Sequence, residues 1–245
     1  MKIALLATGF PRNYKQTFDS WYHFLFSKYD VDMYITSWDK MEVNYNPHAV
    51  RHLPKKDQLK NLDIADLKDF YKDFITDSLF IDYDKFYQNR FPSIEILEHR
   101  LFDVMKVTQK GRQLGGFWVE RLRDQYFVLK NCWDIIPNKE QYDLFFKIRF
   151  DVFIEQIEIL PKYKLVVPKS ILDYKFQDFL AYGDYEHMEK YCNIFDHIEE
   201  MYVKHNVPVY HAERMYNWYL TEYCGLDYHI DKNSEYQLVR EISNT

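Results

Sequence analysis

Short, nearly continuous apolar runs alternate along the chain with segments whose apolar residues recur at helical spacing. The first run, Ile3 to Ala7, is closed by Gly9 and Pro11, which is typical of a strand buried on both faces in a parallel sheet. Helical spacing over 15–28 follows, and a second strand-like run covers 31–36. The order strand, helix, strand predicts a βαβ unit at the start of the chain.

The rest of the chain continues this alternation, with polar, turn-rich sequence over 40–54 that predicts a loop. We expect further strands over 78–81, 142–151, 164–167 and 178–182, and helices over 56–75, 94–107, 117–132, 185–204 and 212–223. No internal repeat interrupts the pattern. It predicts an α/β fold with a central, mostly parallel sheet flanked by helices.

Length and composition narrow this prediction. A chain of 245 residues fits one elaborated domain over 1–245, and 47% hydrophobic with 19% aromatic residues exclude a disordered protein. Only six glycines are present, and neither GxGxxG nor GxxxxGK[ST] occurs. P-loop kinases and ordinary Rossmann dehydrogenases are therefore excluded, and a bound nucleotide must be held by side chains and helix termini.

Charge and cysteine content bear on partners and location. The net charge of −6 argues against a large surface for nucleic acids. The cysteines, Cys132, Cys192 and Cys224, form no CxxC motif, which favours a reducing compartment. The apolar start stops at Thr8, too short for a signal peptide, and no run of 18 apolar residues follows. We therefore expect a soluble, cytoplasmic protein without a transmembrane segment.

Polar and aromatic residues follow the predicted strands, where parallel sheets bind ligands. Arg12, after Pro11, is suited to bind a diphosphate through two hydrogen bonds. Trp38 or Asp39 is suited to contact a base or ribose. The alternatives are a loop arginine and a packed tryptophan.

The strand over 142–151 carries the most informative acid. Arg149 and Asp151 lie two residues apart and so on the same face, and charges in a buried strand are rare unless they are paired or bind something. Asp151 is accordingly the leading candidate for a cation-binding or catalytic carboxylate, with a structural ion pair to Arg149 as the alternative. The pairs Asp30/Asp32 and Asp82/Asp84 are more typical of solvated surface acids.

Five segments in this order resemble small cytoplasmic sugar transferases of the GT-A fold, found in bacterial polysaccharide clusters and large DNA viruses. They are Lys2–Arg12, Asp32–Asp39, Asp124–Tyr126, Tyr142–Asp151 and Gln177–Gly183. The resemblance covers nearly the whole chain. It implies a GT-A-like, Rossmann-like domain and a nucleotide-sugar-dependent hexosyl- or pentosyltransferase of glycan biosynthesis, with a glycan or glycoprotein acceptor and a UDP-sugar as the favoured donor.

The resemblance also implies positions for the donor. Arg12 would lie near the phosphates, Asp39 near the nucleoside, and Asp151 at the position of the family's metal-binding acid, with Mn or Mg as the cation. Many GT-A enzymes carry Asp-x-Asp where this chain has Arg149-x-Asp151, so either one carboxylate holds a metal or Arg149 partly replaces it. The expected donor-binding set is Pro11, Arg12, Thr36, Trp38, Asp39, Arg121, Arg123, Gln125, Arg149, Tyr182 and Gly183.

The predicted helix over 117–132 places Arg121 and Gln125 on one face and Arg123 on another. One of these arginines is therefore expected to contact donor phosphate while the other is solvated.

Three acids are candidates for catalysis: Asp151, Asp178 and Glu213. The segment His211–Glu213 follows Pro208 at the start of a helix, where the Glu213 carboxylate or the His211 imidazole is suited to act as general base on an acceptor hydroxyl. The alternative is that Glu213 caps the helix and complements its dipole. Asp178 precedes the Tyr182–Gly183 turn that is expected to pass close to the donor sugar. His229 is a candidate second metal ligand, and its alternative is a structural histidine.

The leading function is transfer of a sugar to a hydroxyl by positioning and by stabilising the leaving diphosphate. The alternative is a catalytically silent carbohydrate-binding or scaffold protein on the same fold, favoured by the missing first Asp of Asp-x-Asp. A nucleotidyltransferase ranks third because a Gly-rich phosphate loop is absent near residue 10.

Overall fold

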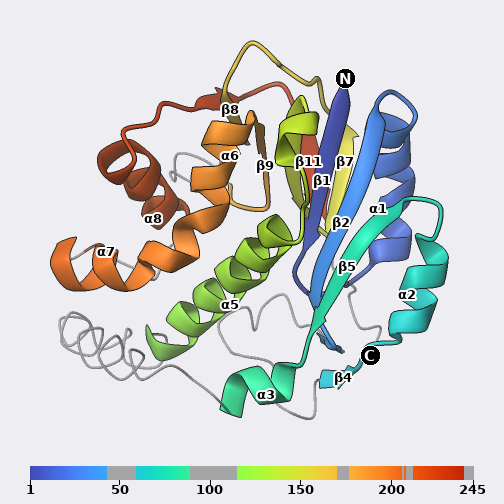
Figure 1. Cartoon of the computed structure of the whole chain (residues 1–245), viewed down its shortest axis with the longest axis horizontal. Helices are drawn as coiled ribbons and strands as arrows, with labels where there is room; N and C mark the ends of the chain where they lie inside the picture. The colour runs from blue at the N-terminus through green and yellow to red at the C-terminus, as the bar shows by residue number, and fades with distance from the viewer. Residues whose placement is uncertain (43–58, 89–114, 170–176, 206, 208–211, 240–245) are drawn as a thin grey trace.

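A computed structural model describes residues 1–42, 59–88, 115–169, 177–205, 207 and 212–239 (Figure 1). Its centre is a seven-stranded sheet in the order β10-β8-β9-β6-β1-β2-β5. The strands are β1 (Lys2–Thr8), β2 (Asp30–Trp38), β5 (Ile75–Ile81), β6 (Leu144–Arg149), β8 (Leu165–Pro168), β9 (Leu180–Gly183) and β10 (His229–Asp231). β9 pairs antiparallel with β6 and β8, and the other pairs are parallel. The expected α/β class with a mostly parallel central sheet is confirmed.

Two small antiparallel pairs flank this sheet. They are β3 (Lys40–Glu42) with β4 (Leu59–Asn61), and β7 (Val152–Gln156) with β11 (Glu235–Leu238). The second pair brings the end of the described chain beside the segment that follows β6, because the Val239 amide donates to the Asp151 carbonyl at 2.8 Å.

Helices cover both faces of the central sheet (Figure 1). α1 (Tyr14–Trp21), continued by a π-helical turn over Tyr22–Phe26, and α2 (Ile64–Phe70) pack on one face. The other face is covered by α5 (Gly115–Asp134), α6 (Tyr185–Cys192) and α8 (Ala212–Trp218), the last continued by a π-helical turn over Tyr219–Tyr223. The remaining helices are α3 (Tyr83–Gln88) and α7 (Ile198–His205), with 3-10 turns over Lys139–Gln141 and Asn193–His197.

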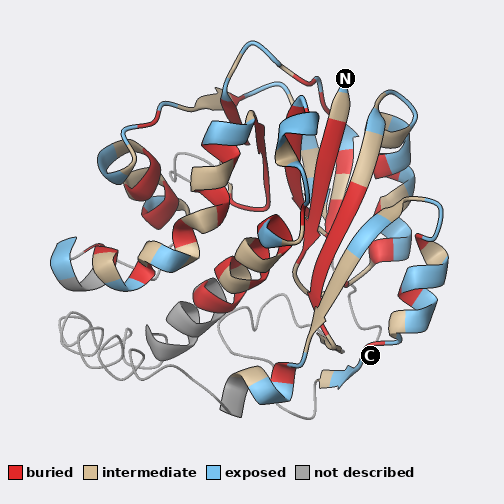
Figure 2. Ribbon diagram, in the orientation of Figure 1, coloured by how far each residue is buried: buried red, intermediate tan, exposed pale blue. Residues whose placement is uncertain are grey.

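The strand pattern explains this two-sided packing. Residues Ile3 to Ala7 of β1 are all fully buried, and the buried residues concentrate along β1 and β2 in Figure 2. Alternate side chains enter opposite cores: Leu5 packs with Trp21 of α1, whereas Leu6 packs with Leu129 of α5. A strand buried on both faces must be apolar throughout, which is why its sequence shows no alternation.

Several predicted boundaries are corrected. The helix expected over 56–75 is much shorter: β4 occupies Leu59–Asn61, and α2 begins only after Asp63, whose carboxylate caps the helix by accepting from the Asp66 amide. β5 then starts at Ile75 rather than residue 78. The helix expected over 185–204 is interrupted by the 3-10 turn, and the one expected over 94–107 lies outside the described residues.

The antiparallel direction of β9 matters most for function. Because β9 runs opposite to β6, its start lies at the sheet edge where β6 ends, and the Arg149 amide donates to the Phe179 carbonyl at 3.1 Å. Its end, Gly183, lies opposite Phe145 near the start of β6. Residues immediately before β9 therefore join the carboxyl edge of the sheet, and residues at its end leave it.

Candidate functional site

The carboxyl edge of the sheet gathers the main candidate residues. Thr8 at the end of β1 lies between Thr36 of β2 and Arg149 of β6 in the strand register. The segment before β9 joins them from the other side of β6 and carries Asp178. This edge is where open α/β sheets place their ligands.

Arg149 and Asp151 form a two-point ion pair at the end of β6. Arg149 Nε lies 3.0 Å from Asp151 Oδ1, and Nη2 lies 2.6 Å from Oδ2. The Asp151 side chain is 6% exposed and that of Arg149 is 25% exposed. The ion pair that the sequence left as an alternative is thus present, with the guanidinium as its more accessible member.

Asp178 is held by hydrogen bonds from the helices α5 and α6. Gln125 Nε2 of α5 donates to Asp178 Oδ2 at 2.5 Å, and the Tyr191 hydroxyl of α6 lies 3.5 Å from the Asp178 carbonyl oxygen. The Tyr191 ring stacks on that of Tyr216 of α8, with centroids 4.4 Å apart. Asp178 itself is 7% exposed, so side chains from α5 and α6 hold a buried residue beside the end of β6.

Lys147 is a buried cation of this edge that the sequence analysis did not assign to the site. It is 1% exposed, lies on the same face of β6 as Arg149, and donates through Nζ to the Asp178 carbonyl. Burial lowers the pKa of Lys147 to about 8, and the opposing effect of Asp178 is smaller. The signal was available, since a lysine inside an apolar strand run requires a partner.

Glu213 lies in the first turn of α8 and interacts electrostatically with both Asp178 and Arg149. Burial, reinforced by the negative charge of Asp178, raises the pKa of Glu213 to about 7 despite the opposing effect of Arg149. The carboxyl groups of Asp178 and Glu213, 35 positions apart in the sequence, thus interact electrostatically, and the pKa of Glu213 lies near neutrality. A carboxyl group with this pKa is suited to accept a proton at physiological pH.

An aromatic cluster occupies the ends of β1 and β2. Trp38, 2% exposed, is packed against Phe10, Tyr83, Phe86 and Phe127, so the packed-tryptophan alternative describes its position. Two guanidinium groups lie at the borders of this cluster: Arg12 Cζ is 5.5 Å from the Phe10 ring centroid, and Arg123 Cζ is 5.3 Å from that of Phe86.

Arg123 is distinctive because its guanidinium is buried and incompletely bonded. The residue is 5% exposed, and Nη2 lies 3.2 Å from Asp124 Oδ1. Among the described residues, its Nε and Nη1 atoms have no hydrogen-bond partner. A buried donor without a partner costs about 1–3 kcal/mol, so an incoming anion that accepted from these atoms would recover that cost.

The other expected donor residues near β1 and β2 are buried or bonded within the fold. Pro11 is buried, and Thr36, which pairs with Thr8 near the carboxyl edge, is fully buried. The Asp39 carboxylate accepts from the Tyr83 amide at 2.9 Å and so caps the start of α3. The side chain of Arg121 lies outside the described residues, as does His211.

Tyr182 and Gly183 are not brought to this edge. The Tyr182 hydroxyl bonds the Glu158 carbonyl and the Leu160 amide, both at 3.2 Å, and its ring stacks on Phe146. A Cβ atom at Gly183 would lie 2.2 Å from the Lys164 carbonyl oxygen. The glycine is therefore needed for close contact between strands β9 and β8, at the edge opposite Arg149.

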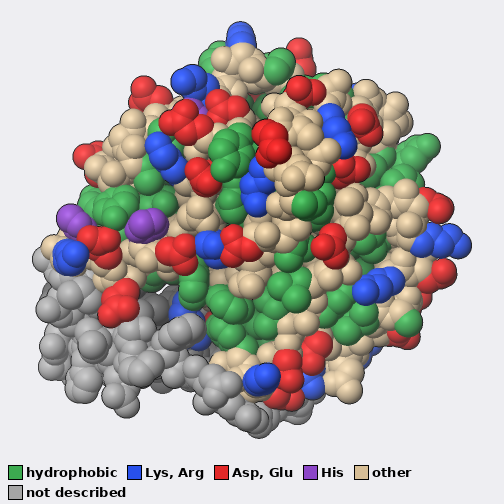
Figure 3. Space-filling model, in the orientation of Figure 1, with side chains coloured by type: hydrophobic (Ala, Val, Ile, Leu, Met, Phe, Trp, Pro, Cys, Tyr) green, Lys and Arg blue, Asp and Glu red, His purple; other side chains and the backbone are tan. Residues whose placement is uncertain are grey.

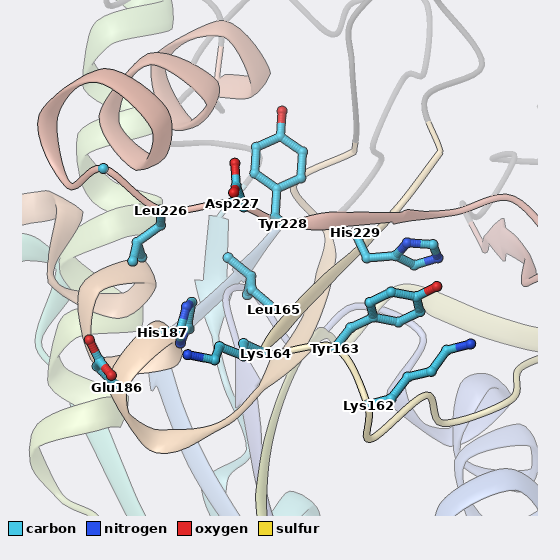
Figure 4. A pocket seen from close by; sticks show the side chains of 11 residues that line it. Lys162, Tyr163, Lys164, Leu165, Glu186, His187, Leu226, Asp227, Tyr228 and His229 are labelled. Atoms are coloured by element: carbon cyan, nitrogen blue, oxygen red, sulfur yellow. The ribbon is translucent and has the colours of Figure 1, made fainter.

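His229 also lies away from Asp151. It stacks on Tyr163 with ring centroids 3.7 Å apart, and both line a pocket of about 540 Å³ between the start of β8, α6 and the segment before β10 (Figure 4). Three inter-strand steps separate β10 from β6, which corresponds to roughly 14 Å. The expectation that His229 and Asp151 share a metal is not supported by this geometry.

The described residues do not fit a divalent cation at this edge. They contain no group of three or more His, Cys, Asp or Glu side chains arranged to hold a metal. Both oxygens of Asp151 accept from Arg149, and Lys147 adds a second positive charge nearby. The carboxyl groups of Asp178 and Glu213 offset these positive charges, so the described residues of the edge have no excess of carboxylates that would attract a dication.

The surface and the helices add two general findings. On the face shown in Figure 3, the acidic and basic side chains of the described residues are interspersed, unlike the single-signed surface that binds duplex nucleic acids. None of the helices in the described part of the chain is long and apolar enough to cross a membrane.

Comparison with known proteins gives likeness only at the level of structure. No protein-family model and no curated protein sequence matches the chain. Its structure is similar to apo mouse xyloside xylosyltransferase 1, with 11% identity and a TM-score of 0.42 over 94% of this chain and 85% of that one.

It is also similar to galactosyltransferase LgtC in complex with donor and acceptor sugar analogues, with 10% identity and a TM-score of 0.40 over 90% of this chain and 70% of that one. An active-site mutant of LgtC gives 11% identity and a TM-score of 0.39 over 89% and 69%. These neighbours are glycosyltransferases. At such low identity, a functional conclusion has to come from the residues of this chain.

Proposed function

We propose that the chain is a glycosyltransferase that moves a sugar from a nucleoside-diphosphate donor, with UDP-sugars favoured, to a hydroxyl group of a glycan or glycoprotein. The observation that carries this proposal is the gathering of Arg149, Asp151, Asp178 and Glu213 at the carboxyl edge of the sheet. It combines a guanidinium for phosphate with an acid that titrates near neutrality, the two groups that such a transfer requires.

These groups account for every bond and proton that changes in the transfer. The bond between the donor sugar C1 and the diphosphate oxygen breaks, and its electron pair stays on the diphosphate. The acceptor oxygen forms the new bond to C1, and its proton passes to the Glu213 carboxylate. Asp178, fixed by Gln125 and Lys147, orients hydroxyl groups of the sugars by accepting their hydrogen bonds.

Donor phosphate contacts come from the arginines around the edge. Arg123 has two buried nitrogens that no described residue bonds, and Arg12 follows β1 at the border of the aromatic cluster around Trp38. The ordered resemblance of five sequence segments to GT-A sugar transferases of bacteria and large DNA viruses supports the same assignment. A single domain over 1–245 accommodates it.

The location follows from the cysteines. All three are unpaired, and Cys132 and Cys192 are fully buried. We propose that the protein works in a reducing compartment such as the cytoplasm.

The proposed activity is tested with the full chain by a thermal-shift screen against UDP-, GDP- and dTDP-sugars, followed by measurement of nucleotide release. A donor that binds only the folded state raises Tm, and the active donor should release its nucleotide in the presence of acceptor glycans. The variant Asp178→Asn should keep the donor-induced shift and lose at least 100-fold in transfer rate.

The matched control is Glu199→Gln, an exposed acid of α7 away from the site, which should transfer at the wild-type rate. If glycans bind the protein while no nucleotide or nucleotide-sugar shifts Tm, the silent carbohydrate-binding alternative replaces the proposal.

A further inference from the structure

The Arg149–Asp151 pair differs in net charge from a metal site built on Asp-x-Asp. Two carboxylates at positions 149 and 151 would carry a charge of −2, whereas the ion pair carries none. Arg149 is the more exposed partner, with 25% of its side chain accessible against 6% for Asp151. A ligand at the end of β6 can therefore reach the arginine more readily than the carboxylate.

The bonding within the pair reinforces this arrangement. The two hydrogen bonds, at 3.0 and 2.6 Å, use both Asp151 oxygens and orient the planar guanidinium. A dication on Asp151 would have to displace the guanidinium and then remain a few ångströms from it. In a partly buried site that repulsion is stronger than it would be in water.

The neighbouring charges do not restore a cation site. Lys147 lies two residues before Arg149 on the same face of β6 and bonds the Asp178 carbonyl. Glu213, whose pKa burial raises to about 7, is only partly ionised at neutral pH. Across this edge the described residues therefore balance positive against negative charge, and no excess of carboxylates attracts a metal ion.

We infer that Arg149, oriented by Asp151, stabilises the leaving diphosphate in the place where a divalent cation would otherwise act, so that donor binding and transfer do not require metal. This inference rests on the proposed glycosyltransferase function. As the C1–O bond breaks, negative charge grows on the diphosphate oxygen, and the guanidinium donates hydrogen bonds to it while keeping all its protons. Asp151 is then a positioning residue, because it acts through Arg149.

Calorimetry with UDP as the probe tests the inference on the full chain. Wild-type protein should bind UDP with the same Kd, within twofold, in EDTA and in Mn²⁺. Titration of Mn²⁺ alone, followed by the electron paramagnetic resonance signal of the free ion, should show no binding to the wild type.

The variant Arg149→Asp places two carboxylates two residues apart. It should lose at least tenfold in UDP affinity in EDTA, bind Mn²⁺, and recover UDP affinity when Mn²⁺ is added. The matched variant Arg149→Gln, which is shorter, keeps an amide hydrogen-bond donor and carries no charge, should lose a similar affinity and show no response to Mn²⁺. It also keeps the test decisive if Arg149→Asp does not fold.

The possible results separate two failures. UDP binding by the wild type only in Mn²⁺ would overturn the inference and leave the proposed function standing. Unchanged UDP affinity in Arg149→Gln would likewise overturn it. No binding of UDP, GDP or dTDP under either condition would overturn the proposed function itself, and the inference with it.

Discussion

Glu213 and Lys147 show how burial at one sheet edge changes ordinary side chains. The pKa values of both groups are displaced toward neutrality: that of Glu213 rises to about 7, and that of Lys147 falls to about 8. Burial is the largest cause of each shift. The negative charge of Asp178 raises the pKa of both groups. Single substitutions at this edge should consequently change pH dependence as well as rate.

Glu213→Gln should remove a titration from the transfer reaction. A general base works when deprotonated, so the wild-type rate should rise with pH through about 7 and then level off. The variant should be at least 100-fold slower and lack this rise. Initial rates between pH 5.5 and 8.5 at saturating donor check the prediction, and persistence of the rise in Glu213→Gln would assign it to another group.

The same substitution should change stability with a defined sign. Because the folded-state pKa of Glu213 is raised from 4.5 to about 7, the folded protein holds its proton longer than the unfolded chain does. Ionisation then destabilises the fold progressively as pH rises from about 4.5 to 7. Glu213→Gln should therefore gain in Tm relative to the wild type over this window, and equal Tm differences at pH 4 and pH 8 would contradict the shift.

Arg123→Met should weaken nucleotide binding more than it weakens the fold. Two of the buried Arg123 nitrogens have no hydrogen-bond partner among the described residues, so removal of the guanidinium relieves a cost while losing the bond to Asp124 and the contact with the Phe86 ring. Loss of a charge-assisted contact to phosphate should reduce UDP affinity by about 1.5–3 kcal/mol. Calorimetry measures this loss, with Lys130→Met on the same helix as the control that should bind normally.

At the scale of elements, the direction of β9 decides which residues form the site. Both β6 and β9 read as apolar runs, and their sequences do not reveal that they pair antiparallel. That pairing brings Asp178 to Arg149 and takes Gly183 to the opposite edge, where β9 and β8 come into close contact.

Gly183→Ala should accordingly damage the fold and spare the chemistry. Its Cβ would lie 2.2 Å from the Lys164 carbonyl oxygen, so the β8 and β9 backbones must separate. We expect a loss of about 2–4 kcal/mol in unfolding free energy, as for other overpacked backbone positions. Urea unfolding measures it, and unaltered UDP affinity of the folded fraction would confirm that the glycine does not contact the donor.

At the scale of the whole molecule, the central sheet separates two large hydrophobic cores. Cys132 and Cys192 are fully buried in the core beneath α5 and α6, whereas Cys224 is partly exposed. Burial raises the pKa of the Cys132 thiol to about 12, which removes its reactive thiolate form.

Thiol labelling should therefore report on global stability. In the native protein one thiol, Cys224, should react within minutes, and the other two should react at rates that fall as a bound nucleotide stabilises the fold. Mass spectrometry after labelling distinguishes the three sites. Equal native reactivity of all three cysteines would show that this core opens locally.

The sequence by itself determined the class of the fold and much of the site. Strands buried on both faces are mostly apolar, so β1, β2 and β6 were visible as apolar segments, and Arg149 and Asp151 stood out at the end of one of them. Glu213 and Asp178 were also found as candidates, although the sequence suggested no contact between them. Their roles in catalysis stay predictions.

Only the tertiary structure decided which of these residues meet. Strand direction and order are set by long-range pairing, so the sequence did not reveal that β9 reverses or that three inter-strand steps separate His229 from Asp151. Side-chain partners are decided in the same way: Trp38 is packed within an aromatic cluster, Asp39 caps a helix, and Arg149 binds Asp151. These contacts join residues far apart in the chain or depend on rotamers, which local patterns do not encode.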